Sequence, residues 1–231
     1  MDNKEHGFGY LLINKPEEIT SHGVVSRLRK ITGIKKIGHA GTLDPFATGL
    51  LILAIGRKAT KNISKFVKLD KEYVATLFLG AETDTYDKTG KTVLSSEKEM
   101  KSSFKEIDLV VRQFIGPQLQ IPPMFSAKKI KGKKLYELAR KGVEVERRPA
   151  AIEIFALEIV GFKWPYLEIK VHCSSGTYIR SIAYEIGKKL GCGAYLEALK
   201  RTKIGDFSLK NAKNLDDLNT DNWVESIFQQ L

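Results

Sequence analysis

The sequence predicts an α+β protein in which a mixed, mostly antiparallel sheet is flanked by helices. Some segments alternate apolar and polar side chains, which is typical of strands, and in others apolar residues recur every three or four positions, as in helices. The two kinds of segment do not follow the strict strand–helix–strand rhythm of a parallel sheet, and one pair of strand segments is joined by a short turn in hairpin fashion. The sequence shows no internal repeat.

The first part of the chain mixes strands and short helices. Residues 10–13 favour a strand, and Thr20 or Ser21 caps a helix whose apolar side chains share one face. The continuous apolar run at 50–55 is suited to a buried central strand. A short lysine-rich helix follows, and residues 73–79 form another strand that ends in a loop of turn-forming residues.

The second part of the chain begins with an amphipathic helix over residues 97–114. Residues 152–160 and 166–173 are predicted strands joined by a turn, and the second of them alternates so that one face is buried and one is wet. Residues 178–190 favour a helix with a single apolar stripe. We expect a terminal helix from roughly 214 to 228.

The charge balance points to a polyanionic partner. The 231 residues carry a net charge of +11 and 42% are hydrophobic, which is ample for a core. Nucleic acid is the leading candidate and an anionic membrane surface the alternative. The longest apolar run is too short to cross a bilayer, and the start of the chain does not read as a secretory signal, so a cytoplasmic protein is expected. Its two cysteines, Cys173 and Cys192, support neither a zinc site nor a disulfide.

Asp44 is the most informative single residue. It lies in GIKKIGHAGTLDPFATG, residues 33–49, where glycines at 41 and 49 permit unusual backbone geometry and Pro45 biases Asp44 away from helix. A carboxylate set among cations on a rigid loop suits a reactive group near a polyanion. The alternative is an ordinary Asp-Pro turn.

The region around Asp44 resembles the first signature of the TruB family of tRNA pseudouridine synthases. The stretch is LLINKPEEITSHGVVSRLRKITGIKKIGHAGTLDPFATGLLILAIGRKATK, residues 11–61, and it departs from the family at Glu18, where glycine is usual. A second signature resembles HCSSGTYIRSIAYEIGKKLGCGAYLEALKRTKIG, residues 172–205, and a third resembles IPPMFSAKKIKGKKLYELARKGVEV, residues 121–145. The resemblance implies the pseudouridine synthase fold, with a catalytic cleft across the middle of the sheet.

The resemblance also assigns roles to individual residues. It implies that Asp44 is the catalytic carboxylate, that Arg180 pairs with it, and that Tyr73 stacks on uracil and takes part in proton transfer at carbon five. By themselves, Arg180 reads as a surface arginine in the first turn of a helix and Tyr73 as an ordinary strand tyrosine. The implied substrate-binding residues are His39, Leu199, Tyr178, Lys128, Lys133, Lys134 and Arg140.

Residues 121–148 are predicted to be an RNA-binding insertion. Nine cations occur between 128 and 148, a phosphate-binding footprint, although a solvated charged face is the alternative. The acids Asp84 and Asp87 lie in a loop that resembles a calcium site only superficially, and the family's similar loop lies beside the active-site cleft. We expect neither a metal nor a cofactor.

The sequence therefore predicts an enzyme that isomerises uridine 55 in the T-loop of tRNA, acting as a monomer. Residues 1–210 form the expected catalytic domain, and residues 211–231 a short helical tail with no PUA domain. One rival is a guide-RNA-dependent synthase of the dyskerin type. Another is a non-catalytic tRNA-binding chaperone, which would share the basic surface but would not need Asp44, Tyr73 and Arg180 together.

Overall fold

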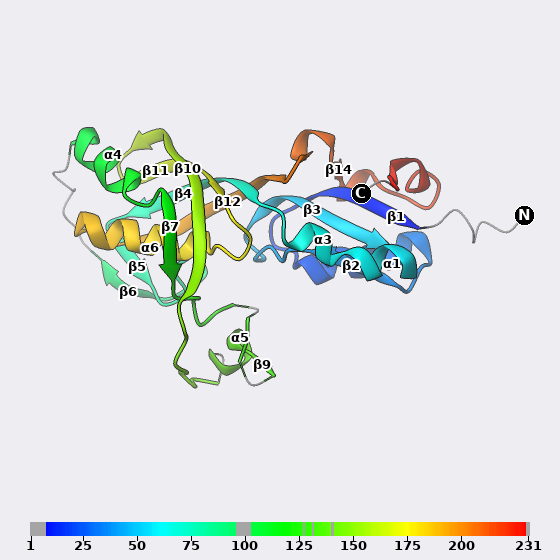
Figure 1. The fold of residues 1–231 in the computed structure, drawn as a ribbon, viewed down its shortest axis with the longest axis horizontal. Helices are drawn as coiled ribbons and strands as arrows, with labels where there is room; N and C mark the ends of the chain where they lie inside the picture. The colour runs from blue at the N-terminus through cyan, green and yellow to red at the C-terminus, as the bar shows by residue number, and fades with distance from the viewer. Residues whose placement is uncertain (1–7, 96–102, 127, 131, 140, 230–231) are drawn as a thin grey trace, which may run out of the picture. The chain divides into compact units, whose positions relative to one another are not determined.

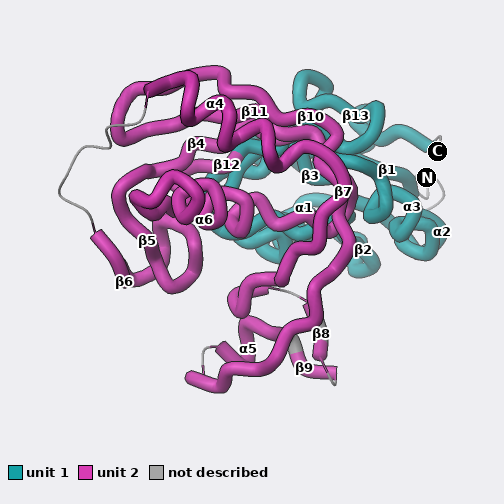
Figure 2. The backbone as a smooth tube through the Cα atoms, turned by 60° about the vertical axis from the view of Figure 1, so that its left-hand side comes forward, with its two compact units in different colours: residues 1–72, 200–231 teal, residues 73–199 magenta. Residues whose placement is uncertain are grey.

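The computed structural model describes residues 8–95, 103–126, 128–130, 132–139 and 141–229 (Figure 1). The chain forms two compact units: unit 1 is Met1–Glu72 with Lys200–Leu231, and unit 2 is Tyr73–Leu199 (Figure 2). The chain passes from one unit to the other within two strands, β4 (Lys71–Leu79) and β12 (Ala194–Ile204).

Unit 1 is built on strands in the order β14-β1-β3-β12. Strand β1 (Gly9–Lys15) pairs antiparallel with β3 (Thr48–Ile55) and parallel with β14 (Lys213–Asn214). Strand β2 (Ile37–Ala40) is antiparallel to β3, and β13 (Phe207–Ser208) is antiparallel to β12. The helices of the unit are α1 (Ser21–Thr32), α2 (Gly56–Asn62) and α3 (Ser64–Val67).

Strand β3 is buried on both faces, which explains its continuous apolar run. Leu51, Leu53 and Ile55 pack with the apolar stripe of α1, whereas Leu50 and Ile52 pack with Phe66 and its neighbours on the other side. Unit 1 thus has helices on both faces of its sheet. Thr20, not Ser21, caps α1, because its side chain accepts a hydrogen bond from the Gly23 amide.

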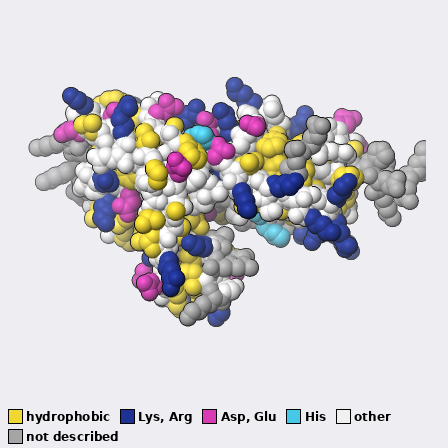
Figure 3. All heavy atoms as spheres, viewed as in Figure 1, with side chains coloured by type: hydrophobic (Ala, Val, Ile, Leu, Met, Phe, Trp, Pro, Cys, Tyr) yellow, Lys and Arg dark blue, Asp and Glu magenta, His cyan; other side chains and the backbone are white. Residues whose placement is uncertain are grey.

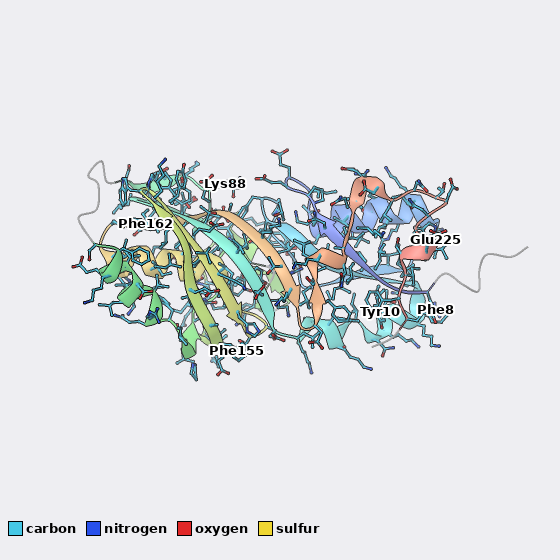
Figure 4. The ribbon with its side chains drawn as sticks, turned by 90° about the horizontal axis from the view of Figure 1, so that it is seen from above. Phe8, Tyr10, Lys88, Phe155, Phe162 and Glu225 are labelled. Atoms are coloured by element: carbon cyan, nitrogen blue, oxygen red, sulfur yellow. The ribbon has the colours of Figure 1, made fainter. Side chains whose placement is uncertain are left out.

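The prediction of a terminal helix over 214–228 is wrong. Two 3-10 turns, η2 (Leu215–Asp217) and η3 (Val224–Ser226), replace it, and η1 (Leu209–Asn211) precedes them. Asn219 accepts hydrogen bonds from the amides of Asp221 and Asn222, and such side-chain bonds compete with helix. The segment then returns to β1, where the peptide groups of Tyr10, labelled in Figure 4, and Phe228 exchange two hydrogen bonds.

Unit 2 is a mostly antiparallel sheet with helices packed on it, and its strand order is β12-β4-β11-β10-β7. Strands β10 (Ala150–Lys163) and β11 (Tyr166–Cys173) form the predicted hairpin, and alternate residues of β11 are buried as expected. Strand β7 (Gly116–Gln120) pairs with β10, and β5 (Ala81–Thr83) pairs with β6 (Thr92–Ser95).

Two helices of unit 2 agree with the sequence. The helix expected over 97–114 is α4 (Phe104–Arg112), which begins at a capping box formed by Ser103 and Glu106. Residues 97–102 of that prediction lie outside the described residues. The helix expected over 178–190 is α6 (Ile179–Leu190). The 121–148 segment contains β8 (Lys129–Ile130), β9 (Lys133–Lys134) and α5 (Leu135–Ala139).

Glu18 occupies a left-handed backbone conformation with φ 65°, which a side chain disfavours by about 1–2 kcal/mol. Glu18→Gly should therefore raise the free energy of unfolding, by about 1 kcal/mol after the greater chain entropy of glycine is subtracted. Glu18→Ala is the matched control, because it removes the carboxylate and keeps the strained Cβ. Equal denaturant midpoints for the two variants would show that the backbone at Glu18 is not strained.

Candidate active site

The Asp44 loop joins β2 to β3 in unit 1, and Asp44 is half-buried. Gly41 has φ +73°, and a Cβ there would lie 3.3 Å from the Arg201 Nη1 atom. Gly49 has φ +101°, and a Cβ there would lie 2.3 Å from the Arg201 carbonyl oxygen. The prediction that these two glycines allow positive φ or close backbone approach is confirmed.

Two buried side chains form hydrogen bonds to the backbone of the residues on either side of Asp44. The Ser21 hydroxyl accepts from the Leu43 amide at 2.9 Å and donates to the Leu43 carbonyl at 3.1 Å. The Lys15 ammonium donates to the Pro45 carbonyl at 3.1 Å. The backbone immediately before and after Asp44 is therefore fixed by long-range hydrogen bonds, which the sequence patterns did not indicate.

Lys15 is fully buried, and its ammonium also donates to the carbonyls of Pro16 at 2.7 Å and Ile19 at 2.8 Å. Burial lowers the pKa of Lys15 to about 8, against the attraction of Asp44, which raises it. Arg201 is also buried, and its guanidinium donates to the carbonyls of Leu50 at 2.8 Å and Gly41 at 2.9 Å. Two buried cations thus support the loop that carries Asp44.

His39 lies on β2 opposite Leu53, half-buried in the same unit. Burial lowers its pKa, and the positive charge of Arg201 and the neighbouring His22 lower it further. Its Nδ1 atom is buried without a hydrogen-bond partner among the described residues. At neutral pH the ring is therefore uncharged.

Arg180 lies in the first turn of α6 and is almost completely buried. Its Nη1 atom donates to the Asp87 carboxylate at 3.2 Å and to the Thr85 carbonyl at 3.1 Å. Its Nη2 atom donates to the Phe125 carbonyl at 2.7 Å. The interpretation of Arg180 as a surface arginine is therefore wrong, and Asp87 is a partner that sequence reasoning missed. Pairing with Asp44, which belongs to the other unit, stays a prediction.

The Asp87 carboxylate is fully engaged. Its second oxygen accepts from the Thr85 hydroxyl at 2.8 Å, the Thr89 amide at 3.0 Å and the Thr89 hydroxyl at 2.5 Å. A Cβ on Gly90 would lie 2.3 Å from the Thr85 hydroxyl oxygen, so only glycine closes this loop. Of the two acids in the loop, Asp87 pairs with Arg180, and the Asp84 carboxylate accepts from the Lys91 amide at 2.8 Å. Among the described residues, no group of three His, Cys, Asp or Glu side chains could hold a metal ion.

Tyr178, a predicted substrate-binding residue, directly precedes α6. One side chain bonds both its amide and its carbonyl, as Ser21 does for Leu43. The Gln120 side chain accepts from the Tyr178 amide at 2.8 Å and donates to its carbonyl at 3.0 Å. Gln120 is therefore a second supporting residue that sequence reasoning missed. Tyr73 and Leu199 are both buried, and they are the first and last residues of unit 2.

The predicted RNA-binding insertion is partly described. Lys128 and Lys133 are exposed, the backbone of Lys134 lies in β9, and Arg140 lies outside the described residues. RNA binding by this segment stays a prediction.

Unit 1 carries a second basic surface, which the sequence analysis did not predict. Residues 19–69 contain ten Lys and Arg residues and a single acid, Asp44. Lys and Arg side chains gather along the lower margin of unit 1 in Figure 3. Five exposed cations lie on helices α2 and α3 or directly after α3, and we call them the α2–α3 basic surface: Arg57, Lys58, Lys61, Lys65 and Lys68.

No helix in the described part of the chain is long and apolar enough to cross a membrane.

Comparison with known proteins finds two family models that together match most of the chain. Residues 29–179 match the N-terminal domain of the TruB family pseudouridylate synthases, and residues 180–230 match the C-terminal domain of tRNA pseudouridylate synthase B. The tRNA pseudouridine synthase B of Protochlamydia amoebophila is 50% identical over 93% of this chain and 81% of its own length. That of Clostridium tetani is 50% identical over 95% of this chain and 75% of its own length.

Solved structures with a similar fold come from larger assemblies. A chain of a Cbf5-Nop10-Gar1 complex has a TM-score of 0.72 and 30% identity over 93% of this chain. A chain of an H/ACA RNP bound to a substrate RNA containing 2'-deoxyuridine has a TM-score of 0.70 and 27% identity over 94% of this chain. The present chain spans about half the length of both, 54% and 55%.

The depressed pKa of Lys15 predicts how stability depends on pH. The native state releases this proton near pH 8 and the unfolded state near 10.5, so the unfolded state binds more protons between these values. Stability from this group is present above pH 10.5 and is lost as pH falls through 8. The unfolding free energy of the wild type, measured against Lys15→Met, should rise across this window by up to about 1.4 kcal/mol per pH unit. Lys65→Met, at an exposed position, is the control and should give a flat difference.

Proposed function

Because the chain belongs to the TruB family of pseudouridylate synthases, we propose that it converts uridine 55 in the T-loop of tRNA to pseudouridine. The observation that carries this proposal is the Asp44 loop, whose flanking residues are fixed by Ser21 and Lys15. Fixed geometry places a reactive carboxylate before the substrate arrives, which lowers the entropy cost of reaction. The fold and the relatives named tRNA pseudouridine synthase B support the same activity.

The reaction is an isomerisation. The bond between the sugar and N1 of uracil breaks, the base rotates, and a bond forms between the sugar and carbon five. Carbon five then loses its proton and N1 gains one, so no atom is added or lost. The Asp44 carboxylate either attacks the nucleoside covalently or removes a sugar proton to give a glycal, and in both routes it is regenerated at the end. Tyr73 stacks on the uracil and takes part in the proton transfer at carbon five.

Arg180 supplies a fixed cation to this chemistry. Its guanidinium is held by Asp87, Thr85 and Phe125 in unit 2. A planar guanidinium forms two directed hydrogen bonds to a carboxylate and stays charged in a dry site, so Arg180 is the proposed partner of Asp44. Leu199 packs near the target base in this proposal.

The target base must leave the stacked loop to reach the half-buried Asp44 carboxylate, and extrusion costs a few kcal/mol. We propose that the uncharged His39 ring takes the place of the extruded base. Phosphates of the tRNA bind to the cations of residues 121–148 and to the α2–α3 basic surface. We further propose that the enzyme acts as a monomer in the cytoplasm and without a metal or cofactor.

A guide-RNA-dependent activity is the second candidate, because the chains of the Cbf5 and H/ACA assemblies share the fold at 30% and 27% identity. The relatives named for tRNA are 50% identical and favour the tRNA activity. Conversion of an unmodified T-arm stem-loop by the purified protein, with no guide RNA added, distinguishes the two candidates. Conversion that requires a guide RNA would overturn the proposal.

Asp44→Asn keeps the size of the side chain and removes its charge. The variant should fold and bind tRNA normally, because phosphate contacts supply most of the affinity, and product should fall below detection. Asp206→Asn makes the same chemical change at an exposed turn and should leave turnover unchanged. Product from Asp44→Asn, with deamidation excluded by mass spectrometry, would show that Asp44 is not the catalytic carboxylate.

The α2–α3 basic surface predicts a change in the salt dependence of binding. Lys61→Ala with Lys65→Ala should weaken tRNA binding and reduce the slope of log Kd against log salt by about one unit for each phosphate that is no longer neutralised. Lys210→Ala with Lys213→Ala removes the same charge from exposed positions elsewhere and should leave the slope unchanged. Lys133→Ala with Lys134→Ala tests the 121–148 segment in the same titration. Equal slopes for the Lys61, Lys65 variant and its control would remove this surface from the interface.

A further inference from the structure

Tyr86 has a left-handed backbone with φ 63°, and Glu18 is the other non-glycine residue of the described chain with positive φ. For a bulky aromatic residue this conformation is strained, and it persists only where the surroundings impose it. Tyr86 lies between Thr85 and Asp87, which both hold Arg180. The strain is therefore located in the turn that supports the proposed catalytic cation. Lys88, labelled in Figure 4, follows this turn.

The strained turn places two hydrogen-bond acceptors around Arg180. The Thr85 carbonyl and the Asp87 carboxylate lie 3.1 Å and 3.2 Å from the same Nη1 atom of Arg180. The intervening Tyr86 instead bonds the protein backbone, donating to Thr83 at 3.1 Å and accepting from Leu196 at 2.9 Å. One oxygen from each residue that flanks Tyr86 therefore accepts from the same nitrogen of Arg180.

The Tyr86 ring stacks on Tyr184, with centroids 4.2 Å apart and planes at 20°. Tyr184 is four residues after Arg180 on α6, so both side chains project from the same face of that helix. Helix α6 thus holds the 85–87 turn at two points, through hydrogen bonds from Arg180 and through a ring stack from Tyr184. Burial raises the pKa of both phenols, so both rings remain neutral at physiological pH.

We propose that the Tyr86–Tyr184 stack is a positioning pair, which holds the 85–87 turn in its left-handed conformation and thereby sets the direction of the Arg180 guanidinium during catalysis. The role of Arg180 rests on the proposed function. The stack acts through Arg180 and not on the substrate, so its loss lowers the rate of the chemical step and leaves tRNA affinity intact. The aromatic faces make the contact, so phenylalanine at position 184 preserves the effect.

The test compares Tyr184→Ala with Tyr184→Phe and with Tyr195→Ala. Tyr195 stacks on Phe78 in the same unit, with centroids 5.0 Å apart and planes at 16°, and it controls for the general loss of a ring stack. With a T-arm stem-loop in single turnover, Tyr184→Ala should react at least about tenfold more slowly at saturating RNA with nearly unchanged Kd. Tyr184→Phe and Tyr195→Ala should react at nearly the wild-type rate.

A wild-type rate for Tyr184→Ala, or an equal loss in Tyr195→Ala, overturns the proposal. If Tyr184→Ala does not fold, Tyr184→Leu replaces it, because leucine keeps apolar bulk without an aromatic face. An inactive wild type would instead overturn the proposed function. The stack is then judged by the NMR signal of the Arg180 Nε–H group, assigned with Arg180→Lys. This signal should shift or broaden in Tyr184→Ala and stay unchanged in Tyr195→Ala, and an unchanged signal in both variants overturns the proposal.

Discussion

Buried cations solvated by backbone carbonyls are the constraint on which the candidate site of unit 1 depends. Lys15, Lys71 and Arg201 are at most 5% exposed, and carbonyl oxygens accept hydrogen bonds from all three. A carbonyl dipole satisfies a donor without cancelling its charge, so the positive potential persists in a region of low dielectric. The attraction between Lys15 and Asp44 is one result. Two of the accepting carbonyls, Pro45 for Lys15 and Gly41 for Arg201, belong to the Asp44 loop, so hydrogen bonds that solvate these two cations also fix the loop.

The same hydrogen-bonding arrangement supports a proposed catalytic residue in each unit. A polar side chain bonds both the amide and the carbonyl of one residue close to a proposed catalytic group: the buried Ser21 holds Leu43, and the half-buried Gln120 holds Tyr178. Such a pair of bonds fixes the peptide planes on both sides of the residue and therefore the direction in which the chain continues. Asp44 follows directly after Leu43, and Arg180 follows two residues after Tyr178. Preorganised geometry of this kind costs no reorganisation at the moment of reaction.

Local sequence patterns predicted the elements in which the order of apolar and polar residues shows directly which faces are buried. The bounds of β11 agree with its alternation, and the apolar run of β3 is explained by burial on both faces. The 214–228 helix failed because Asn219 offers the backbone other partners, which a period count does not register. Ser21, Gln120 and Asp87 were missed as supporting residues because their partners lie 22 to 93 positions away along the chain. No local pattern encodes such pairings.

Backbone strain falls where the proposed chemistry is. The left-handed Glu18 donates its amide to the Pro45 carbonyl at 2.9 Å, the same oxygen that Lys15 bonds, and Pro45 adjoins Asp44. The left-handed Tyr86 separates the two residues that hold Arg180. In the described chain, both non-glycine residues with this conformation therefore support a loop behind a proposed catalytic group. The sequence places a non-glycine residue at positive φ beside each proposed catalytic group. Each such residue lowers the stability of the fold and helps to fix the direction of the catalytic side chain.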